Sequence, residues 1–157
     1  MLDFFKLITF FGSAYFLIGI SVLLVLIIKN KKTSLSISLN LLLVFLFNQG
    51  LKQIFKMPRP DNPLVKVSGY SFPSGHAMVS FAFYGFLIYL ILKHMKNQKI
   101  KVLSIICLSL LILLIGYSRV YLHAHFPIDV ICGFIFSFIY LMVYIKIIDK
   151  KCNKNKS

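Results

Sequence analysis

A histidine and an aspartate stand four residues apart in the segment SRVYLHAHFPID, residues 118–129. This spacing is about one helical turn, so the carboxylate of Asp129 can reach the imidazole of His125. A carboxylate on one ring nitrogen fixes the tautomer and leaves the other nitrogen available as a nucleophile or base. His123 lacks this partner because Pro127 occupies the same spacing. The pattern favours His125 as the reactive histidine. The alternative is a hydrogen bond that only stabilises the start of a helix.

A second histidine follows a serine and a glycine in the segment FPSGH, residues 72–76. Ser74 is a residue type preferred at helix N-caps, so the first unpaired backbone N–H groups belong to Gly75, His76 and the next residue. The amino-terminal end of a helix attracts anions, and a glycine lets an anion approach the backbone closely. His76 is then placed to give a proton to such an anion. The alternative is an ordinary capped helix start with a surface histidine.

Two cations stand seven residues apart in the segment KQIFKMPRP, residues 52–60. Seven residues make two helical turns, so Lys52 and Arg59 on one helix would share a face. Pro58 and Pro60 would end such a helix nearby, which places Arg59 at its carboxyl-terminal end. The alternative is that both side chains only extend toward lipid headgroups from the end of a membrane span.

The elements that must position these residues are membrane helices. Hydrophobic residues make up 59% of the 157 residues, against about 45–50% in soluble domains, and the mean hydropathy is +0.85. A helix needs about 20 apolar residues to cross a bilayer. Five uncharged runs approach or exceed this length: 7–28, 34–51, 77–92, 102–118 and 130–145. The sequence therefore predicts an all-α membrane bundle of about five transmembrane helices, forming a single domain over residues 1–157.

The basic residues are divided unevenly between the links that join these runs. Eighteen lysines and arginines accompany four acids, giving a net charge of +14. Two links and the carboxyl-terminal tail carry twelve of the basic residues: Lys29, Lys31, Lys32, Lys93, Lys96, Lys99, Lys101, Lys146, Lys150, Lys151, Lys154 and Lys156. Cytoplasmic segments collect lysine and arginine, so these three segments are predicted to be cytoplasmic, together with the carboxyl terminus. The amino terminus and residues 52–72 and 119–126 are then outside. The charge is a topology signal, and no nucleic-acid partner is predicted.

The outward segments bring the groups described above to one face of the membrane, where Arg119 adds a third cation. Ionisable groups near membrane depth are costly and usually functional. Cations and backbone N–H groups suit a phosphoryl group, whose charge lies on its equatorial oxygens. One neutral histidine can attack phosphorus, and a second can protonate the leaving oxygen. Metal-dependent phosphatases need clusters of carboxylates, and only three aspartates are outside, so no metal ion is predicted.

Three motifs in this order resemble those of the type 2 phosphatidic acid phosphatase family, which is related to the vanadium haloperoxidases. That family carries K-x6-R-P, then P-S-G-H, then S-R-x5-H-x3-D. Every motif position is filled here with the family's spacing, over residues 52–129: Lys52, Arg59, Pro60, Pro73, Ser74, Gly75, His76, Ser118, Arg119, His125 and Asp129.

The resemblance implies a role for each group. His125 would form a phosphohistidine with Asp129 orienting its ring, and His76 would protonate the leaving group and then activate water. Five residues would hold the phosphate: Lys52, Arg59, Ser74, Gly75 and Arg119. No cofactor is implied. Membrane members of the family usually have six spans, three of them before the first motif, whereas two precede it here.

The resulting prediction is a metal-independent lipid phosphatase of the cell membrane with its active site on the extracytoplasmic side. It would hydrolyse a phosphomonoester or diphosphate of a membrane lipid, such as phosphatidylglycerol phosphate, phosphatidic acid or undecaprenyl diphosphate. The alternative from a different class is a non-catalytic membrane protein that binds anionic lipid headgroups. A vanadate-dependent oxidant enzyme is disfavoured because those relatives are soluble.

Overall fold

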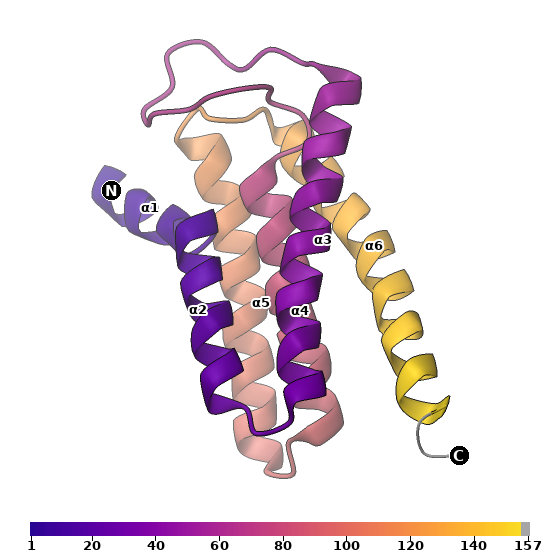
Figure 1. Ribbon diagram of the computed structural model, residues 1–157. Coiled ribbons are helices and arrows are strands. Elements are labelled where there is room, and N and C mark those ends of the chain that lie inside the picture. The colour runs from indigo at the N-terminus through magenta and orange to yellow at the C-terminus, as the bar shows by residue number, and fades with distance from the viewer. Residues whose placement is uncertain (155–157) are drawn as a thin grey trace.

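The computed structural model describes the backbone of residues 1–154 and the side chains of residues 1–151. Within that part of the chain every regular element is a helix (Figure 1). The six helices are α1 (Leu2–Phe10), α2 (Ala14–Ile27), α3 (Lys31–Phe55), α4 (Gly75–His94), α5 (Gln98–Tyr121) and α6 (Pro127–Lys154). The all-helical fold predicted from the sequence is confirmed. The predicted cytoplasmic Lys156 lies outside the described residues.

Four helices, α3 to α6, are long and apolar enough to cross a bilayer, and α1 with α2 makes a fifth crossing if the pair is one bent span. The two helices of that pair meet at 43°. The first span predicted at residues 7–28 is therefore not one continuous helix, because the chain breaks at residues 11–13. Ser13 N-caps α2, and its hydroxyl accepts a hydrogen bond from the Phe16 N–H at 3.3 Å. A count of apolar residues contains no signal for such a local cap.

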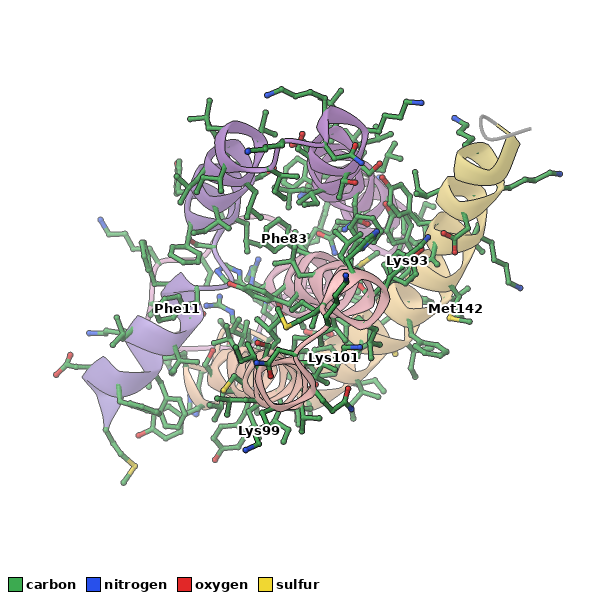
Figure 2. The ribbon with its side chains drawn as sticks, turned by 90° about the horizontal axis from the view of Figure 1, so that it is seen from below. Phe11, Phe83, Lys93, Lys99, Lys101 and Met142 are labelled. Atoms are coloured by element: carbon green, nitrogen blue, oxygen red, sulfur yellow. The ribbon has the colours of Figure 1, made fainter. Side chains whose placement is uncertain are left out.

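Helix α4 lies at the centre of the bundle, with α3, α5 and α6 packed around it (Figure 2). Its core-facing side chains are almost fully buried: Ala77, Met78, Ala82, Phe83 and Phe86. Large apolar side chains on the outside, including Leu103, Leu113 and Ile139, are more than half exposed. Lipid is as apolar as these side chains, so this outward distribution is the one expected of a membrane bundle.

Polar side chains inside the bundle pair across helices rather than with water. The Asn40 amide of α3 donates to the Ala82 carbonyl of α4 at 3.0 Å, and the Tyr144 hydroxyl of α6 donates to the Ser36 carbonyl of α3 at 2.6 Å. A membrane interior offers no water to satisfy such groups. Each interhelical bond contributes about 0.6 kcal/mol in membrane proteins, so these contacts fix helix register more than they add stability.

The two ends of the bundle differ in what they carry. The long loop 56–74 and the turn 122–126 lie together at one end (Figure 1). The links between α2 and α3 and between α4 and α5 lie at the opposite end, where Lys93, Lys99 and Lys101 are seen in Figure 2. Lys93 also pairs with Asp149 of α6 at that end. The lysine-rich links and the predicted site segments therefore lie at opposite ends of the bundle.

Candidate active site

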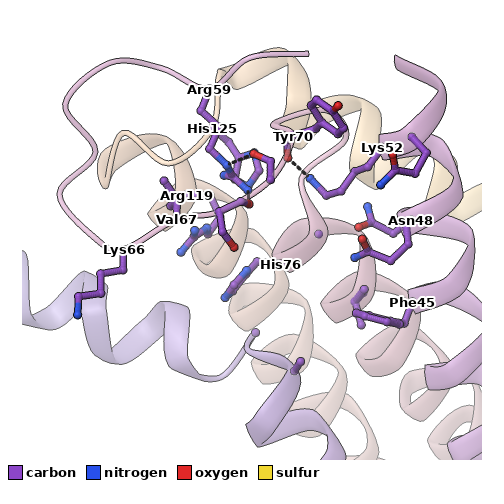
Figure 3. A pocket seen from close by; sticks show the side chains of 18 residues that line it. Phe45, Asn48, Lys52, Arg59, Lys66, Val67, Tyr70, His76, Arg119 and His125 are labelled. Atoms are coloured by element: carbon purple, nitrogen blue, oxygen red, sulfur yellow. Dashed lines mark hydrogen bonds between the residues drawn. The ribbon is translucent and has the colours of Figure 1, made fainter. Parts of the chain in front are cut away.

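A cavity of about 440 Å³ opens at the end of the bundle that carries loop 56–74 (Figure 3). Six of the eight predicted site residues line it: Lys52, Arg59, Gly75, His76, Arg119 and His125. The other two, Ser74 and Asp129, are not among the lining residues and are fully buried. Residues from α3, α4, α5 and two loops thus meet at a single cavity, although the sequence separates them by up to 73 positions (52 to 125).

The His125 ring lies between a carboxylate and a cation. Its Nδ1 is 3.4 Å from Asp129 Oδ2, and its Nε2 is 3.3 Å from an Arg59 guanidinium nitrogen. Asp129 is in the first turn of α6, where the Phe126 N–H donates to the same Oδ2 at 2.9 Å. The contact predicted from the four-residue spacing is present. It is made from the turn that precedes α6, because the helix begins only at Pro127.

Ser71 also contacts this pair, and sequence reasoning missed it. Its hydroxyl donates to Asp129 Oδ2 and lies 3.2 Å from His125 Nδ1. Because the Ser71 hydroxyl donates its proton to the carboxylate, the His125 Nδ1–H is left to donate to Ser71 Oγ and Asp129 Oδ2. This arrangement fixes the tautomer with Nε2 unprotonated toward the cavity. The only sequence signal was the position of Ser71 directly before the FPSGH segment.

The surroundings of His125 keep its ring neutral. Burial, together with the nearby Arg59, Arg119 and Lys52, lowers the pKa of His125 from its usual value near 6.5 to about 4. The hydrogen bond to Asp129 opposes this shift by raising the pKa. The uncharged ring therefore predominates at neutral pH, and Nε2 carries the lone pair that an attack on phosphorus requires.

Arg59 reaches the cavity from a loop, not from a helix. Helix α3 ends at Phe55, and Lys56 adopts a left-handed backbone with φ 47°. The predicted shared helix face of Lys52 and Arg59 is therefore wrong. Arg59 is held instead by backbone carbonyls, donating to Ser68 O at 2.8 Å, Gly69 O at 3.0 Å and Ala124 O at 2.8 Å.

Lys52 is nearly buried on the last turn of α3, and its ammonium group faces loop 56–74 (Figure 3). It donates to the Ser71 carbonyl at 3.1 Å and to the Tyr70 carbonyl. Lys52 and Arg59 therefore both bind backbone carbonyls of the same short stretch, residues 68–71. The two cations converge because this stretch folds back over the cavity, which helical spacing could not predict.

The start of α4 forms the floor of the cavity. Ser74 is at the N-cap position, as expected, and its side chain makes no capping hydrogen bond. Its buried hydroxyl has no partner among the described residues. A Cβ on Gly75 would lie 3.2 Å from the Asn48 side-chain oxygen, tighter than ordinary contacts. Asn48, which the sequence reasoning also missed, donates to the Pro73 carbonyl at 3.3 Å and so supports the turn.

His76 and Arg119 complete the cavity wall. His76 is half-buried, and Figure 3 shows its ring and the Arg119 side chain on the same cavity as His125. Arg119 is 5% exposed, and one guanidinium nitrogen donates to the Thr9 hydroxyl at 2.7 Å. His123, by contrast, is exposed and does not line the cavity.

Among the described residues no three His, Cys, Asp or Glu side chains are grouped so that they could hold a metal ion.

Two histidines, three cations and a helix start around one cavity are what the three sequence motifs led us to expect. A family model described as the PAP2 superfamily matches residues 33–152. The chain belongs to the PAP2 superfamily. A crystal structure of a transmembrane PAP2 type phosphatidylglycerolphosphate phosphatase from Bacillus subtilis superposes with a TM-score of 0.86 at 31% identity, covering 95% of this chain and 77% of that one. The PAP2 membrane fold is thereby confirmed.

Other similar proteins are named for more than one lipid phosphate. Phosphatidylglycerophosphatase B of Bacillus subtilis (strain 168) is 39% identical over 119 residues, 72% of this chain and 58% of that protein. Sphingosine-1-phosphate phosphatase 1 of Rattus norvegicus is 34% identical over 122 residues, 73% of this chain and 28% of that protein. The crystal structure of Aquifex aeolicus LpxE has a TM-score of 0.73 at 29% identity, with 92% of this chain and 85% of that one covered. The matched region thus spans just over half of the Bacillus protein and about a quarter of the rat protein.

Proposed function

We propose that this PAP2 protein is a metal-independent lipid phosphatase that acts through a phosphohistidine on His125. The observation that carries the proposal is the position of His125 Nε2, which lies beside the Arg59 guanidinium in a cavity also lined by Lys52, His76 and Arg119. A nucleophile with three cations around it suits attack on a phosphoryl group, where negative charge must be stabilised in the transition state.

The reaction has two steps at this site. In the first, His125 Nε2 attacks phosphorus, the bond to the lipid oxygen breaks, and His76 gives its proton to that oxygen. In the second, water attacks phosphorus, His76 takes the proton of the water, and the bond to Nε2 breaks to release inorganic phosphate. Asp129 stabilises the positive charge that His125 carries in the intermediate. Lys52, Arg59, Arg119, Ser74 and the Gly75 N–H bind the phosphoryl oxygens.

The substrate is proposed to be a phosphomonoester or diphosphate at the surface of a membrane. Phosphatidylglycerol phosphate is the first candidate, because two of the similar proteins are named for that lipid. Phosphatidic acid and undecaprenyl diphosphate present the same terminal phosphoryl group and are also candidates. The second function is binding of anionic headgroups without hydrolysis, since the same three cations would support it.

Phosphate release separates these two functions and gives the first prediction. Purified protein incubated with vesicles that contain each candidate lipid should release inorganic phosphate, and EDTA should leave the rate unchanged. Vanadate should inhibit, because its five-coordinate form resembles the transition state that the cations stabilise. Loss of activity in EDTA with recovery in Mg²⁺ would contradict the metal-independent mechanism. Lipid binding without phosphate release would favour the binding function.

We further propose that the cavity faces the extracytoplasmic side, with the amino terminus outside and the carboxyl terminus in the cytoplasm. The support is the placement of the lysine-rich links at the end opposite the cavity, together with the tendency of cytoplasmic loops to be basic.

Cysteine labelling in intact cells tests this orientation and gives the second prediction. In a variant with Cys107 and Cys132 replaced by serine, a membrane-impermeant maleimide should label a cysteine introduced by Ser68→Cys, in loop 56–74. Without Ser68→Cys, the same reagent should label Cys152 only after the cells are permeabilised. Labelling of Cys152 in intact cells, with no labelling at position 68, would place the cavity on the cytoplasmic face.

A further inference from the structure

The break between α1 and α2, which we call the elbow (residues 11–13), lies against the cavity. Gly12 is one of the lining residues. A Cβ at this position would lie 2.6 Å from Ile115 Cγ2 and 3.5 Å from His76 Cδ2, so glycine permits the close approach to α5. The Tyr84 hydroxyl of α4 donates to the Phe11 carbonyl at 2.8 Å. The elbow therefore contacts α4 and α5, two of the helices that supply cavity residues.

Helix α1 is attached to α5 by an aromatic contact. The Phe5 ring, 8% exposed, lies 4.2 Å from the Tyr121 ring and 5.5 Å from the Tyr117 ring, measured between centroids. Thr9 follows Phe5 by four residues and so shares its helix face. This packing brings the Thr9 hydroxyl to the Arg119 guanidinium, 110 residues away in sequence, at 2.7 Å.

The Arg119 guanidinium has more donors than its contacts use. One terminal nitrogen is bound to Thr9, while Nε is buried and has no hydrogen-bond partner among the described residues. Nε–H and the second terminal nitrogen lie on one edge of the planar group, the fork that binds two oxygens of a phosphate. A bond at the first nitrogen prevents rotation of the group and leaves this fork for a ligand.

We propose that Thr9 is a positioning residue that orients the Arg119 guanidinium toward the phosphoryl group of the substrate. The inference rests on the proposed phosphatase function and extends the site to α1. Thr9 lies outside residues 33–152, the part matched by the family model, so the family match assigns it no role. The role is inferred from its hydrogen bond with Arg119. A freely rotating guanidinium would lose conformational entropy each time that it bound phosphate. The hydrogen bond to the Thr9 hydroxyl orders the group beforehand and so reduces this cost of binding.

The third prediction compares Thr9→Val, which keeps the side-chain shape and removes the hydroxyl, with Thr9→Ser, which keeps the hydroxyl. Thr33 is the matched control, because it is the second threonine of the chain and lies at the opposite end, in the first turn of α3. Vanadate affinity is measured from the shift in unfolding temperature of the purified protein, which needs no turnover. We expect Thr9→Val to weaken vanadate binding about tenfold, as for the loss of one hydrogen bond to a charged group. Thr9→Ser and Thr33→Val should remain within about twofold of the wild type.

A double-mutant cycle distinguishes positioning from a general structural role. In an Arg119→Lys background, which lacks the planar fork, Thr9→Val should weaken vanadate binding by less than about twofold. An equal loss in both backgrounds, or wild-type affinity in Thr9→Val, would overturn the inference. If Thr9→Val does not fold, Thr9→Ala replaces it, and failure of both to fold would assign Thr9 to stability instead. A wild-type protein that neither binds vanadate nor releases phosphate would reject the proposed function itself.

Discussion

Replacing His125 by asparagine should abolish phosphate release and the phosphoenzyme together. The His125 Nε2 is the proposed attacking atom, so without it no bond to phosphorus can form. In a serine protease, removal of the nucleophile lowers kcat by about 2 × 10⁶, and a loss of similar size would leave no activity above background. The phosphoenzyme is measured with ³²P-labelled lipid, by denaturing the protein without acid, because phosphohistidine is acid-labile.

His123→Asn is the matched control for this variant. The two histidines are separated by one residue, but His123 is exposed and makes none of the described contacts with the cavity. Its backbone has φ 50°, a region that asparagine tolerates better than alanine, so this substitution avoids added strain. Near wild-type turnover is expected for His123→Asn. A labelled phosphoenzyme in His125→Asn, or an inactive His123→Asn, would show that the nucleophile was assigned to the wrong residue.

The contacts predicted correctly from the sequence are those made over a short stretch of chain. His125 and Asp129 are four residues apart, so their meeting depends on one turn of backbone. Pro127 begins α6 as its fixed φ predicts. The apolar runs located α3 to α6 because the bilayer sets both the length and the composition of a span. These predictions depend on local geometry or on the membrane, and both can be read without knowledge of the packing.

The residues that the sequence did not predict act across long separations. Ser71 meets Asp129 over 58 positions, Asn48 meets Pro73 over 25, and Thr9 meets Arg119 over 110. Serine, threonine and asparagine are common in loops and helices, so their type alone marks none of them as part of a site. Only the packing of α1 on α5, and of loop 56–74 over the cavity, brings them to their partners.

The error at Arg59 has the same origin. The seven-residue spacing from Lys52 would place both cations on one helix face, yet α3 ends four residues before Arg59. The two side chains still meet at the cavity, because Ser68, Gly69 and Ala124 hold the guanidinium through their carbonyls. Motif spacing thus identified two residues that meet at the cavity. How Arg59 reaches it depends on the path of loop 56–74, which the sequence did not predict.

Replacing His76 by alanine should reduce hydrolysis by an amount that depends on the leaving group. A lipid alkoxide is a poor leaving group and needs the proton that His76 supplies, and general acid catalysis contributes about 10²–10⁴-fold. We expect a loss in that range for lipid phosphates. An activated aryl phosphate leaves without protonation, so His76→Ala should still form the phosphohistidine at nearly the wild-type rate. Its breakdown should be slow because the attacking water has lost its base.

The steady-state amount of phosphoenzyme is therefore the measurement that best tests the role of His76. With an aryl phosphate, His76→Ala should accumulate more labelled protein at steady state than the wild type, and a burst of phenol should precede slow turnover. His94→Ala is the control, because His94 is an exposed histidine at the other end of the same helix and should behave as the wild type. Equal losses on lipid and aryl substrates without accumulation of the intermediate would remove His76 from proton transfer. His76, which lies on the cavity with Gly12 and Arg119, would then bind the phosphoryl group, and water would have to transfer the protons.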